Sequence, residues 1–423
     1  MAKRKHLIIG SGSAAFGALK RIRSTNWEDG VKLVTAEDYL PYSPTSLPYL
    51  LSGTVKETDI VTGDDSYFDE MRSTLVRGKE VTRIKPQNRE VIYKDGEKDT
   101  YDTLLIATGS EPVVPAILRE AGCHGYHTLS DHNRLLKELE GKSEVTILGG
   151  GLVGMELAVA LAERGYQVSV VTPRERILRR YFDDEADAYI VNIFAANHVP
   201  VYKSWGEVTK AERDQNGLEI SFATGKTSRS QILISCIGVT PRISFLEGSG
   251  IAVRDGVLVD SRMRTNIEDI YAAGDVAEAP DFFTGNQGLS LILPNAVLQG
   301  KVAGSNMVGV ETIDEGWLPM TSFNFFGHVA ISVGMSVAPD NKCQVLKDID
   351  DEKKQYKKLI FKEGRLIGVT FLNVDIYPGV LQYLIRKRIN VGQYSEHLLQ
   401  KPKEIGFWLM QEAERKEALP LEA

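Results

Sequence analysis

A short apolar strand followed by closely spaced glycines and then a helix is the feature that most constrains how this chain can fold. Residues 6–9 read His-Leu-Ile-Ile, residues 10–15 read Gly-Ser-Gly-Ser-Ala-Ala, and a helical stretch continues to residue 23. The first glycine permits the tight turn, the second lets the backbone approach a pyrophosphate, and the final small alanine allows the helix to pack closely on the strand. The helix N-terminus then offers unpaired N–H groups to an anion. The residues that we expect at the phosphates are Gly10, Gly12, Ser13, Ala14 and Ala15.

An acidic residue follows the next predicted strand. Residues 31–35 form that strand, and Glu37 lies just beyond its end. A carboxylate at this point accepts hydrogen bonds from a ribose diol. A cluster of glycines alone is also found where a helix simply packs closely, but strand, turn, helix and terminal acid in register favour a Rossmann-type unit that binds a dinucleotide.

The same arrangement returns in the middle of the chain. Residues 144–148 read as a strand, residues 149–154 as Gly-Gly-Gly-Leu-Val-Gly, and residues 155–164 as a helix. The sequence therefore predicts two dinucleotide sites, with the second unit inserted within the first. The residues that we expect at the second site are Gly149, Gly151, Leu152, Val153 and Gly154.

The second unit lacks a clear acid for the ribose. Its second strand, residues 167–171, ends at Thr172, and Arg174, Arg176 and Arg179 follow. Arginines at this point can hold the 2′-phosphate of NADPH, and Arg174 is the candidate that we name for the site. Glu175 stands among them and can accept a hydrogen bond from the 2′-hydroxyl of NADH, so both NAD(H) and NADP(H) stay open.

Composition and charge exclude several other functions. A net charge of −7, from 50 basic and 57 acidic residues, gives no electrostatic footprint for a nucleic-acid backbone. No apolar run reaches the ~18 residues of a membrane span, and the basic start leads into a short strand rather than a signal peptide, so we expect no membrane partner and a cytoplasmic protein. Cys123, Cys236 and Cys343 match neither a CxxC pair nor a zinc or iron–sulfur ligand set, and we expect no metal.

Two further segments complete a family pattern. Residues 101–110 read as a strand ending in Ala-Thr-Gly-Ser, and residues 265–276 contain a strand ending in Gly-Asp. Together with the two glycine turns, and in this order, they resemble the FAD-dependent pyridine nucleotide–disulfide oxidoreductase superfamily. The resemblance covers about residues 1–310 and implies FAD on the first unit and NAD(H) or NADP(H) on the second.

The resemblance implies an α/β fold with two Rossmann-like domains and a C-terminal α+β interface domain. A length of 423 residues suits two or three domains. The FAD-binding domain is expected to be discontinuous, formed by residues 1–111 and 238–312. The NAD(P)-binding domain is expected at residues 112–237, and the interface domain at residues 313–423, where alternating strands precede a helix near residues 380–388.

The resemblance also assigns residues around the flavin. The Ala-Thr-Gly segment marks the crossing between the two domains, and the Gly-Asp carboxylate binds the ribityl or pyrophosphate region of FAD. A later helix starts with a proline near its first position and, in the family, aims its positive end at the flavin, although an ordinary surface helix can begin in the same way. The candidates are Ala107, Thr108, Gly109, Gly238, Gly274, Asp275, Pro294, Asn295 and Ala296.

The family divides by what lies beside the flavin, and this chain has no cysteine there. Residues 41–53 resemble the corresponding segment of coenzyme A disulfide reductases and NADH peroxidases, and they place Thr45 where those enzymes carry their cysteine. Threonine neither ionises near neutral pH nor forms a mixed disulfide, which disfavours disulfide and peroxide reduction. We therefore expect hydride transfer between nicotinamide and flavin N5, followed by electron transfer to an acceptor outside the chain.

Glu156 is the second candidate for a catalytic role, with Thr45. It matches a glutamate that several relatives place beside the nicotinamide and flavin rings, although an exposed helix glutamate is an equally simple interpretation. Several ferredoxin reductases also have a lysine after Leu-Ser in the preceding segment, where this chain has Gly53.

The C-terminal region points to the electron partner. Residues 320–327 resemble NADH–rubredoxin reductases, which implies an iron–sulfur protein as partner, and flavin subunits of 2-oxoacid oxidoreductases such as phenylglyoxylate dehydrogenase have this size and type. Residues 386–388 read Arg-Lys-Arg and can attract an acidic ferredoxin or form a solvated helix face. The C-terminal domain either forms a homodimer or docks another subunit. Two other hypotheses are an NAD(P)H oxidase that uses oxygen and a flavoprotein that only senses dinucleotides.

Overall fold

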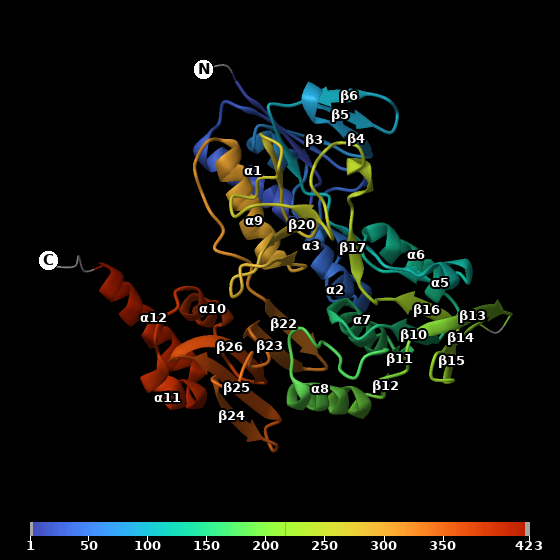
Figure 1. The fold of residues 1–423 in the computed structure, drawn as a ribbon. Helices are drawn as coiled ribbons and strands as arrows, with labels where there is room; N and C mark the ends of the chain where they lie inside the picture. Colours follow the sequence, from blue (N-terminus) through green and yellow to red (C-terminus); the bar gives the residue numbers. More distant parts are fainter. Residues whose placement is uncertain (1–2, 216, 419–423) are drawn as a thin grey trace. The chain divides into compact units, whose positions relative to one another are not determined.

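The computed structural model describes residues 3–215 and 217–418 (Figure 1). Its contacts divide the chain into two compact units. The first unit comprises Met1–Val113, Gly125–Lys137 and Gly238–Leu318, and the second comprises Val114–His124, Glu138–Ile237 and Pro319–Ala423. The three domain boundaries expected from the sequence stay a prediction, and residues 1–2 and 419–423 of the outer two domains lie outside the described residues.

The first unit is built on a parallel sheet with the order β19-β7-β1-β2-β3. Strands β7 and β19 are fully buried and β1 is buried after its first residue, whereas no residue of the edge strand β3 is buried. Central strands of a parallel sheet are buried because helices cover both faces of the sheet. The strands are β1 (Lys5–Ile9), β2 (Gly30–Val34), β3 (Ser73–Val76), β7 (Thr103–Ile106) and β19 (Ile270–Ala272).

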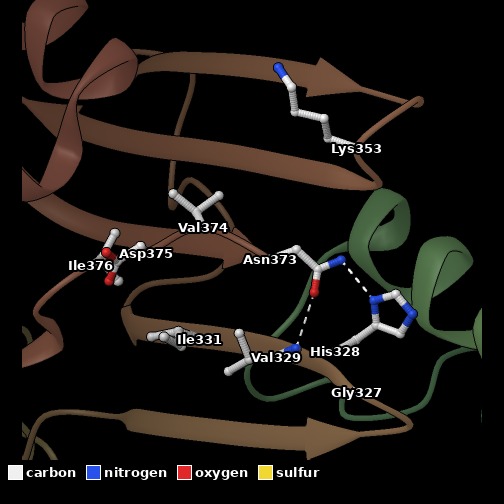
Figure 2. Close-up of a pocket in the computed structure, with 9 residues that line it drawn as sticks. All are labelled: Gly327, His328, Val329, Ile331, Lys353, Asn373, Val374, Asp375 and Ile376. Atoms are coloured by element: carbon white, nitrogen blue, oxygen red, sulfur yellow. Dashed lines mark hydrogen bonds between the residues drawn. The ribbon is translucent and has the colours of Figure 1, made fainter.

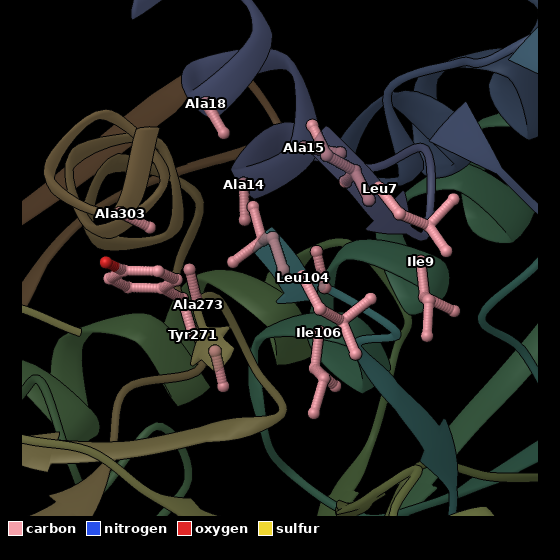
Figure 3. Packing of buried hydrophobic residues seen from close by; sticks show 14 of the residues in the cluster. Leu7, Ile9, Ala14, Ala15, Ala18, Leu104, Ile106, Tyr271, Ala273 and Ala303 are labelled. Carbon is pink, nitrogen blue, oxygen red and sulfur yellow. The ribbon is translucent and has the colours of Figure 1, made fainter. Parts of the chain in front are cut away.

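Two helices from opposite ends of this unit pack against each other. They are α1 (Ser13–Thr25) and α9 (Leu293–Met307). A Cβ atom at Gly300 would meet the Ala14 carbonyl oxygen at 2.0 Å, and one at Gly304 would meet the Ala18 carbonyl oxygen at 2.6 Å. Figure 3 shows the alanines of α1 and Ala303 of α9 over the strand side chains of β1 and β7. Only small residues allow this approach, so the core of the unit joins segments almost 300 residues apart.

Smaller elements complete the first unit. The strands β8 and β17 pair antiparallel where the chain crosses out of the unit and back. Two further sheets are antiparallel apart from the parallel pair β18 and β20. These strands are β4 (Val81–Lys85), β5 (Glu90–Tyr93), β6 (Lys98–Thr100), β8 (Ser110–Pro112), β17 (Val239–Pro241), β18 (Val257–Leu258), β20 (Ala277–Pro280) and β21 (Gln287–Leu289). The short helices are α2 (Leu47–Ser52), α3 (Glu57–Ile60) and α4 (Asp65–Glu70), and α6 (Leu129–Leu139) begins in this unit.

The second unit repeats the Rossmann-type arrangement. Its main sheet has the order β12-β11-β10-β16-β9, with β10 parallel to both β11 and β16. Helix α7 (Leu152–Glu163) follows β10, and α8 (Asp184–Ala196) follows β11. The other elements are α5 (Ala116–Glu120), β9 (His124–Gly125), β10 (Glu144–Leu148), β11 (Gln167–Val171), β12 (Val201–Tyr202), β13 (Val208–Asp214), β14 (Gly217–Phe222), β15 (Thr227–Ser230) and β16 (Ile232–Ser235).

The same unit ends in an antiparallel sheet, which we call the C-terminal sheet, with the order β22-β23-β26-β25-β24. It contains the strands and the helix expected from the sequence in this region. The elements are β22 (Met320–Phe325), β23 (His328–Gly334), β24 (Gln344–Asp350), β25 (Gln355–Lys362), β26 (Arg365–Leu372), α10 (Pro378–Arg386), α11 (Ser395–Gln400) and α12 (Pro402–Ala418).

A hollow lies at one edge of the C-terminal sheet, beside the hairpin of β22 and β23 (Figure 2). Asn373 is one of the residues that line it. Its Oδ1 accepts a hydrogen bond from the Val329 backbone N at 3.1 Å, and its Nδ2 lies 3.0 Å from His328 Nδ1. Within residues 3–215 and 217–418, no helix is long and apolar enough to cross a membrane.

Candidate dinucleotide-binding sites

The first glycine turn joins β1 to α1 in a conformation that requires glycine at its first position. Gly10 has φ +119°, its N–H donates to the Val34 carbonyl at 2.8 Å, and a Cβ atom there would meet the Ala107 carbonyl oxygen at 2.1 Å. A Cβ atom at Gly12 would meet nothing within 4 Å, so this side of the turn is open. Gly12 caps α1 without a side-chain hydrogen bond, which leaves the first N–H groups of Ser13 and Ala14 available to an anion.

Glu37 lies beyond the end of β2 and is half-buried. Its Oε2 accepts a hydrogen bond from the Tyr42 hydroxyl at 2.8 Å, and that hydroxyl accepts from the Leu129 backbone N at 2.9 Å. Burial, and next the nearby Glu37 carboxylate, raise the pKa of Tyr42, so its hydroxyl keeps its proton. The carboxylate is therefore oriented by one donor and retains acceptor capacity for a ribose hydroxyl.

The crossing segment and the Gly-Asp loop meet beside this turn. Thr108 Oγ1 donates to the Arg242 carbonyl at 3.1 Å, and Ser110 Oγ donates to Asp275 Oδ2 at 2.9 Å. Burial raises the pKa of Asp275, although the Ser110 hydrogen bond lowers it in part. Gly238, with φ +144°, accepts from the Val113 backbone N at 2.9 Å and so pairs the two crossing strands.

Gln299 is a residue of this site that sequence reasoning missed. It is fully buried on α9, and its Oε1 accepts from the Gly274 backbone N at 2.9 Å. Its Nε2 has no hydrogen-bond partner within the described part of the chain. A buried amide donor without a partner is unfavourable, so a bound acceptor beside the Gly-Asp loop would satisfy it. Its position, four residues after Asn295 on the same helix face, was the only signal in the sequence.

The start of α9 has its own anchor. Asn295 is buried, and its Nδ2 donates to Ser290 Oγ at 2.6 Å and to the Leu318 carbonyl at 3.1 Å. The side chain therefore holds the helix start in place, and any donor from this residue to a ligand is its backbone N–H. Pro294 lies in the first turn, and Ala296 N donates to the Ile292 carbonyl at 3.1 Å.

The residues of the first unit fit FAD. The turn leaves no room for a Cβ atom at its first position but is open at its second. The Asp275 carboxyl is half-buried with a single side-chain donor, and Gln299 holds a buried amide N–H without a partner among the described residues. An open backbone cradle suits a pyrophosphate, and a half-buried carboxyl with a buried amide suits a polyol chain. Within the described residues, no group of three or more histidine, cysteine or acidic side chains could hold a metal.

The second glycine turn joins β10 to α7 with nearly the same backbone. Gly149 has φ +117°, its N–H donates to the Val171 carbonyl at 2.8 Å, and a Cβ atom there would meet the Cys236 carbonyl oxygen at 2.2 Å. Gly151 is open, as Gly12 is. A Cβ atom at Gly154 would meet the Gly149 carbonyl oxygen at 2.2 Å, so the third small position requires glycine here.

The other residues expected at the second site lie around the same turn. Leu152 begins α7, and Val153 is 38% exposed in its first turn. Cys236 follows β16, and burial raises the pKa of its thiol, which disfavours a reactive thiolate.

The ribose end of the second site carries arginines rather than an acid. Thr172 is buried, and its Oγ1 accepts from the Arg174 backbone N at 3.2 Å. Arg176 donates to the Phe182 carbonyl at 3.2 Å and pairs with Asp184, so it is engaged in holding the chain. The side chains of Arg174 and Arg179 are exposed.

The two candidates for a catalytic role differ in environment. Thr45 belongs to the first unit, is exposed, and its Oγ1 lies 3.0 Å from Ser43 Oγ. Glu156 belongs to the second unit, on α7, and is half-buried rather than exposed on the helix. Burial raises the pKa of Glu156 to about 7, so this carboxyl changes its protonation state near neutral pH.

Comparison with known proteins gives a family for each part of the chain. Residues 4–300 match the family described as pyridine nucleotide-disulphide oxidoreductase, and residues 319–373 match the rubredoxin NAD+ reductase C-terminal domain. The epsilon subunit of an NADH-dependent phenylglyoxylate dehydrogenase from Aromatoleum evansii is 32% identical over 416 residues, which cover 97% of this chain and 98% of that protein.

One further relative agrees in sequence, and one solved structure agrees in fold. An NADH-rubredoxin oxidoreductase from Clostridium acetobutylicum is 28% identical over 86% of this chain and 90% of its own. The structure of a covalent putidaredoxin reductase–putidaredoxin complex superposes with a TM-score of 0.87, at 19% identity, over 98% of this chain and 100% of that chain. At that identity the second likeness shows the fold alone.

Proposed function

The chain belongs to the pyridine nucleotide-disulphide oxidoreductase family and is an FAD-dependent NAD(P)H:acceptor oxidoreductase, and we propose that its electron acceptor is an iron–sulfur protein or subunit. The observation that carries the proposal is the match of residues 319–373 to a rubredoxin reductase C-terminal domain, on a chain whose flavin-side segment has threonine where disulfide reductases have cysteine. The phenylglyoxylate dehydrogenase subunit, matched along nearly its whole length, supports the more specific proposal of a flavin subunit in a 2-oxoacid oxidoreductase.

We assign FAD to the first unit. The N–H groups that follow Gly12 would hold the pyrophosphate, Glu37 would accept from the ribose, and Asp275 and Gln299 would accept from and donate to the ribityl region. The first turn of α9, at Pro294–Ala296, would direct backbone N–H groups at the ring. When bound, FAD accepts a hydride as two electrons and releases them singly.

We assign the nicotinamide dinucleotide to the second unit. The turn from Gly149 to Gly154 would hold its pyrophosphate, and Val153 would give an apolar contact. Arg174 would lie at the ribose or its 2′-phosphate. Glu156, whose pKa burial raises to about 7, would lie beside the nicotinamide and gain or lose a proton near neutral pH.

Thr45 gives the flavin side its distinct chemistry. Its hydroxyl excludes disulfide exchange at this position, because it neither ionises near neutral pH nor attacks a disulfide. We therefore propose that electrons leave the protein singly, to a partner that supplies its own iron–sulfur centre, in the cytoplasm. The C-terminal sheet would form either a homodimer interface or the surface to which that partner binds.

Anaerobic reduction followed by acceptor addition tests the proposal. Purified protein is mixed under nitrogen with NADH or NADPH while the flavin absorbance is followed, and is then offered oxygen, ferricyanide or ferredoxin. We expect rapid bleaching by at least one of the two nucleotides, slow reoxidation by oxygen, and fast reoxidation by ferredoxin. Fast turnover with oxygen alone would make the protein an oxidase, and absence of bleaching would make it a sensor. Copurification with iron–sulfur subunits from the source cell would identify the partner.

A further inference from the structure

A buried ion pair connects the C-terminal sheet to the nucleotide-binding part of the second unit. Lys358 on β25 places Nζ 2.5 Å from Asp183 Oδ2, and the two side chains are 6% and 7% exposed. Lys358 also donates to the Ser336 carbonyl at 2.7 Å, and the Tyr356 hydroxyl donates to the same Asp183 oxygen at 2.7 Å. A buried charge is tolerated only when it is paired and hydrogen-bonded in this way, so the geometry at Asp183 is tightly defined.

Asp183 controls the start of α8. Its second oxygen, Oδ1, accepts from the Ala186 backbone N at 3.1 Å and so caps the helix. One turn later, Asp187 accepts from the Ile177 backbone N at 2.7 Å and from Lys203 Nζ at 2.6 Å. The first turn of α8 is therefore bonded at both of these aspartates, and it holds the segment that leads out of β11.

That segment supports the second glycine turn directly. Leu178 donates its backbone N–H to the Gly150 carbonyl at 2.7 Å, and Leu178 itself has φ +48°. A Cβ atom at Gly150 would meet Ile177 Cγ2 at 2.6 Å, so the Ile177 side chain packs against the backbone of the turn. The Asp187 backbone N also donates to the Asp183 carbonyl at 2.9 Å. Hydrogen bonds, joined by the backbone between Ile177 and Leu178, thus lead from β25 through Asp183 and Asp187 to the middle of the turn.

We propose that Lys358 and Tyr356 of the C-terminal sheet are positioning residues for the nicotinamide dinucleotide, acting through Asp183 and the first turn of α8 on the backbone at Gly149–Gly151. The inference rests on the proposed function of that turn as the pyrophosphate site. Removing the Lys358 ammonium leaves the Asp183 carboxylate buried without its cation, and the carboxylate and the helix start move to rehydrate it. The support of Ile177 and Leu178 under the turn then loosens.

The helix itself stays on the sheet without this ion pair. Phe194, at the other end of α8, stacks on Phe325 with ring centroids 5.8 Å apart and on Phe323 at 6.2 Å. Lys347 of β24 also pairs with Glu185 of α8 at the surface. The Lys358 pair is thus distinguished by its burial and by its connection to the turn, since the other contacts hold the helix but do not reach Gly150.

Nucleotide affinity of flavin-loaded variants tests the proposal. Titration calorimetry with NAD+ and NADP+ gives the dissociation constants, and steady-state reduction of ferricyanide gives KM and kcat. We expect Lys358→Met to weaken binding of the preferred nucleotide about tenfold and Tyr356→Phe about threefold, with kcat at saturation and flavin content unchanged. Lys347→Met removes a surface ion pair between the same sheet and helix, and its affinity should match that of the original protein.

A double variant tests the proposal if Lys358→Met folds poorly, because it removes both charges of the ion pair. Asp183→Asn keeps the helix cap through its Oδ1 and removes the charge, and its amide N–H can donate to the Tyr356 hydroxyl. Asp183→Asn with Lys358→Met should therefore recover most of the affinity lost in Lys358→Met. Unchanged affinity in folded Lys358→Met and Tyr356→Phe, while the original protein binds, would overturn the inference alone. Failure of the original protein to bind either nucleotide would overturn the proposed function and the inference with it.

Discussion

The two glycine turns share a backbone but differ in what surrounds them. In each, the first glycine has a positive φ, +119° at Gly10 and +117° at Gly149, donates to the next strand at 2.8 Å, and faces a strand-end carbonyl too closely for a Cβ atom. The third small residue differs. Ala15 is buried without conflict in the first turn, whereas Gly154 in the second would collide with the Gly149 carbonyl.

The surroundings differ in accessibility as well. The first turn adjoins the buried Gln299, and α9 packs tightly along α1. The second turn is supported by Ile177 and Leu178, while Val153 and the side chain of Arg174 are exposed beside it. We interpret the first environment as suited to a resident group and the second to a ligand that enters and leaves. The same backbone turn can therefore serve both purposes, and its neighbours decide which.

Alanine at the first glycine of each turn should have the largest effect, and the two variants should lose different ligands. Gly10→Ala adds a Cβ atom 2.1 Å from the Ala107 oxygen, at a residue whose backbone is in a left-handed conformation. We expect the free energy of unfolding to fall by at least about 3 kcal/mol. We also expect the protein to be purified without flavin. Gly149→Ala meets the same conflict with Cys236, and we expect it to keep its flavin but to bind no nicotinamide nucleotide. The ratio of flavin to protein absorbance and anaerobic bleaching by NADH or NADPH measure the two outcomes. Flavin loss from both variants alike would show that the turns do not act separately.

The third positions give the next largest effect. Gly154→Ala should weaken nucleotide binding by about 2 kcal/mol, roughly thirtyfold, because the new Cβ atom displaces the Gly149 carbonyl. Ala15→Gly should lower stability by about 1 kcal/mol through helix propensity and leave flavin bound. Calorimetric titration of the first variant and thermal unfolding of the second are the measurements. If Gly154→Ala and the original protein bound the nucleotide with equal affinity, the third positions of the two turns would not differ in what they require.

Glu156, in the second unit, should make the stability of the protein depend on pH near neutrality. Its pKa of about 7 lies above its ordinary value of 4.5, so the folded protein keeps a proton that the unfolded chain releases in this window. Its contribution to stability is therefore greatest below pH 4.5 and is lost as the pH rises through 7, by roughly 3 kcal/mol. Glu156→Gln should unfold at a higher temperature than the original protein at pH 8 but not at pH 5. A constant difference in unfolding temperature across this range would contradict the assignment of the shift to burial.

Gln299 should produce a small effect that is confined to the first site. Gln299→Leu removes the acceptor for the Gly274 N–H and the spare donor, so we expect flavin affinity to fall by about 1–2 kcal/mol. Nicotinamide affinity at the second site should not change. Flavin affinity is measured from the fluorescence of flavin released on dilution. Nicotinamide affinity is measured by calorimetric titration. If flavin retention were unaltered, the Gln299 amide would contact only the protein and not the flavin.

Local patterns made much of the fold predictable. Each glycine turn, with its strand and helix, lies within about 25 residues, and the steric demand at Gly10 and Gly149 is met by glycine alone, so periodicity and turn chemistry reveal it. The α/β fold class and the family predicted from the four segments are confirmed. Strands β23 and β26 of the C-terminal sheet are short runs rich in apolar and β-branched residues, so they could also be predicted.

The remaining features depend on contacts between distant residues. Lys358 and Asp183 are 175 residues apart, and nothing near either residue indicates that the two charges meet in a buried place. Gln299 reads as an ordinary helix residue until Gly274 is seen against it. The side chain of Asn295 turns to Ser290 and Leu318 rather than outward, and a helix pattern cannot reveal that choice. The roles of the individual site residues stay predictions until ligands are measured.

The close packing of α1 on α9 has a consequence for synthesis of the protein on the ribosome. The glycines of α9 that pack against α1 lie near residue 300. The N-terminal Rossmann-type unit therefore cannot complete its core until about three quarters of the polypeptide has emerged. Flavin capture is then a late event, and a chain released early would expose an unfinished apolar surface to chaperones and proteases.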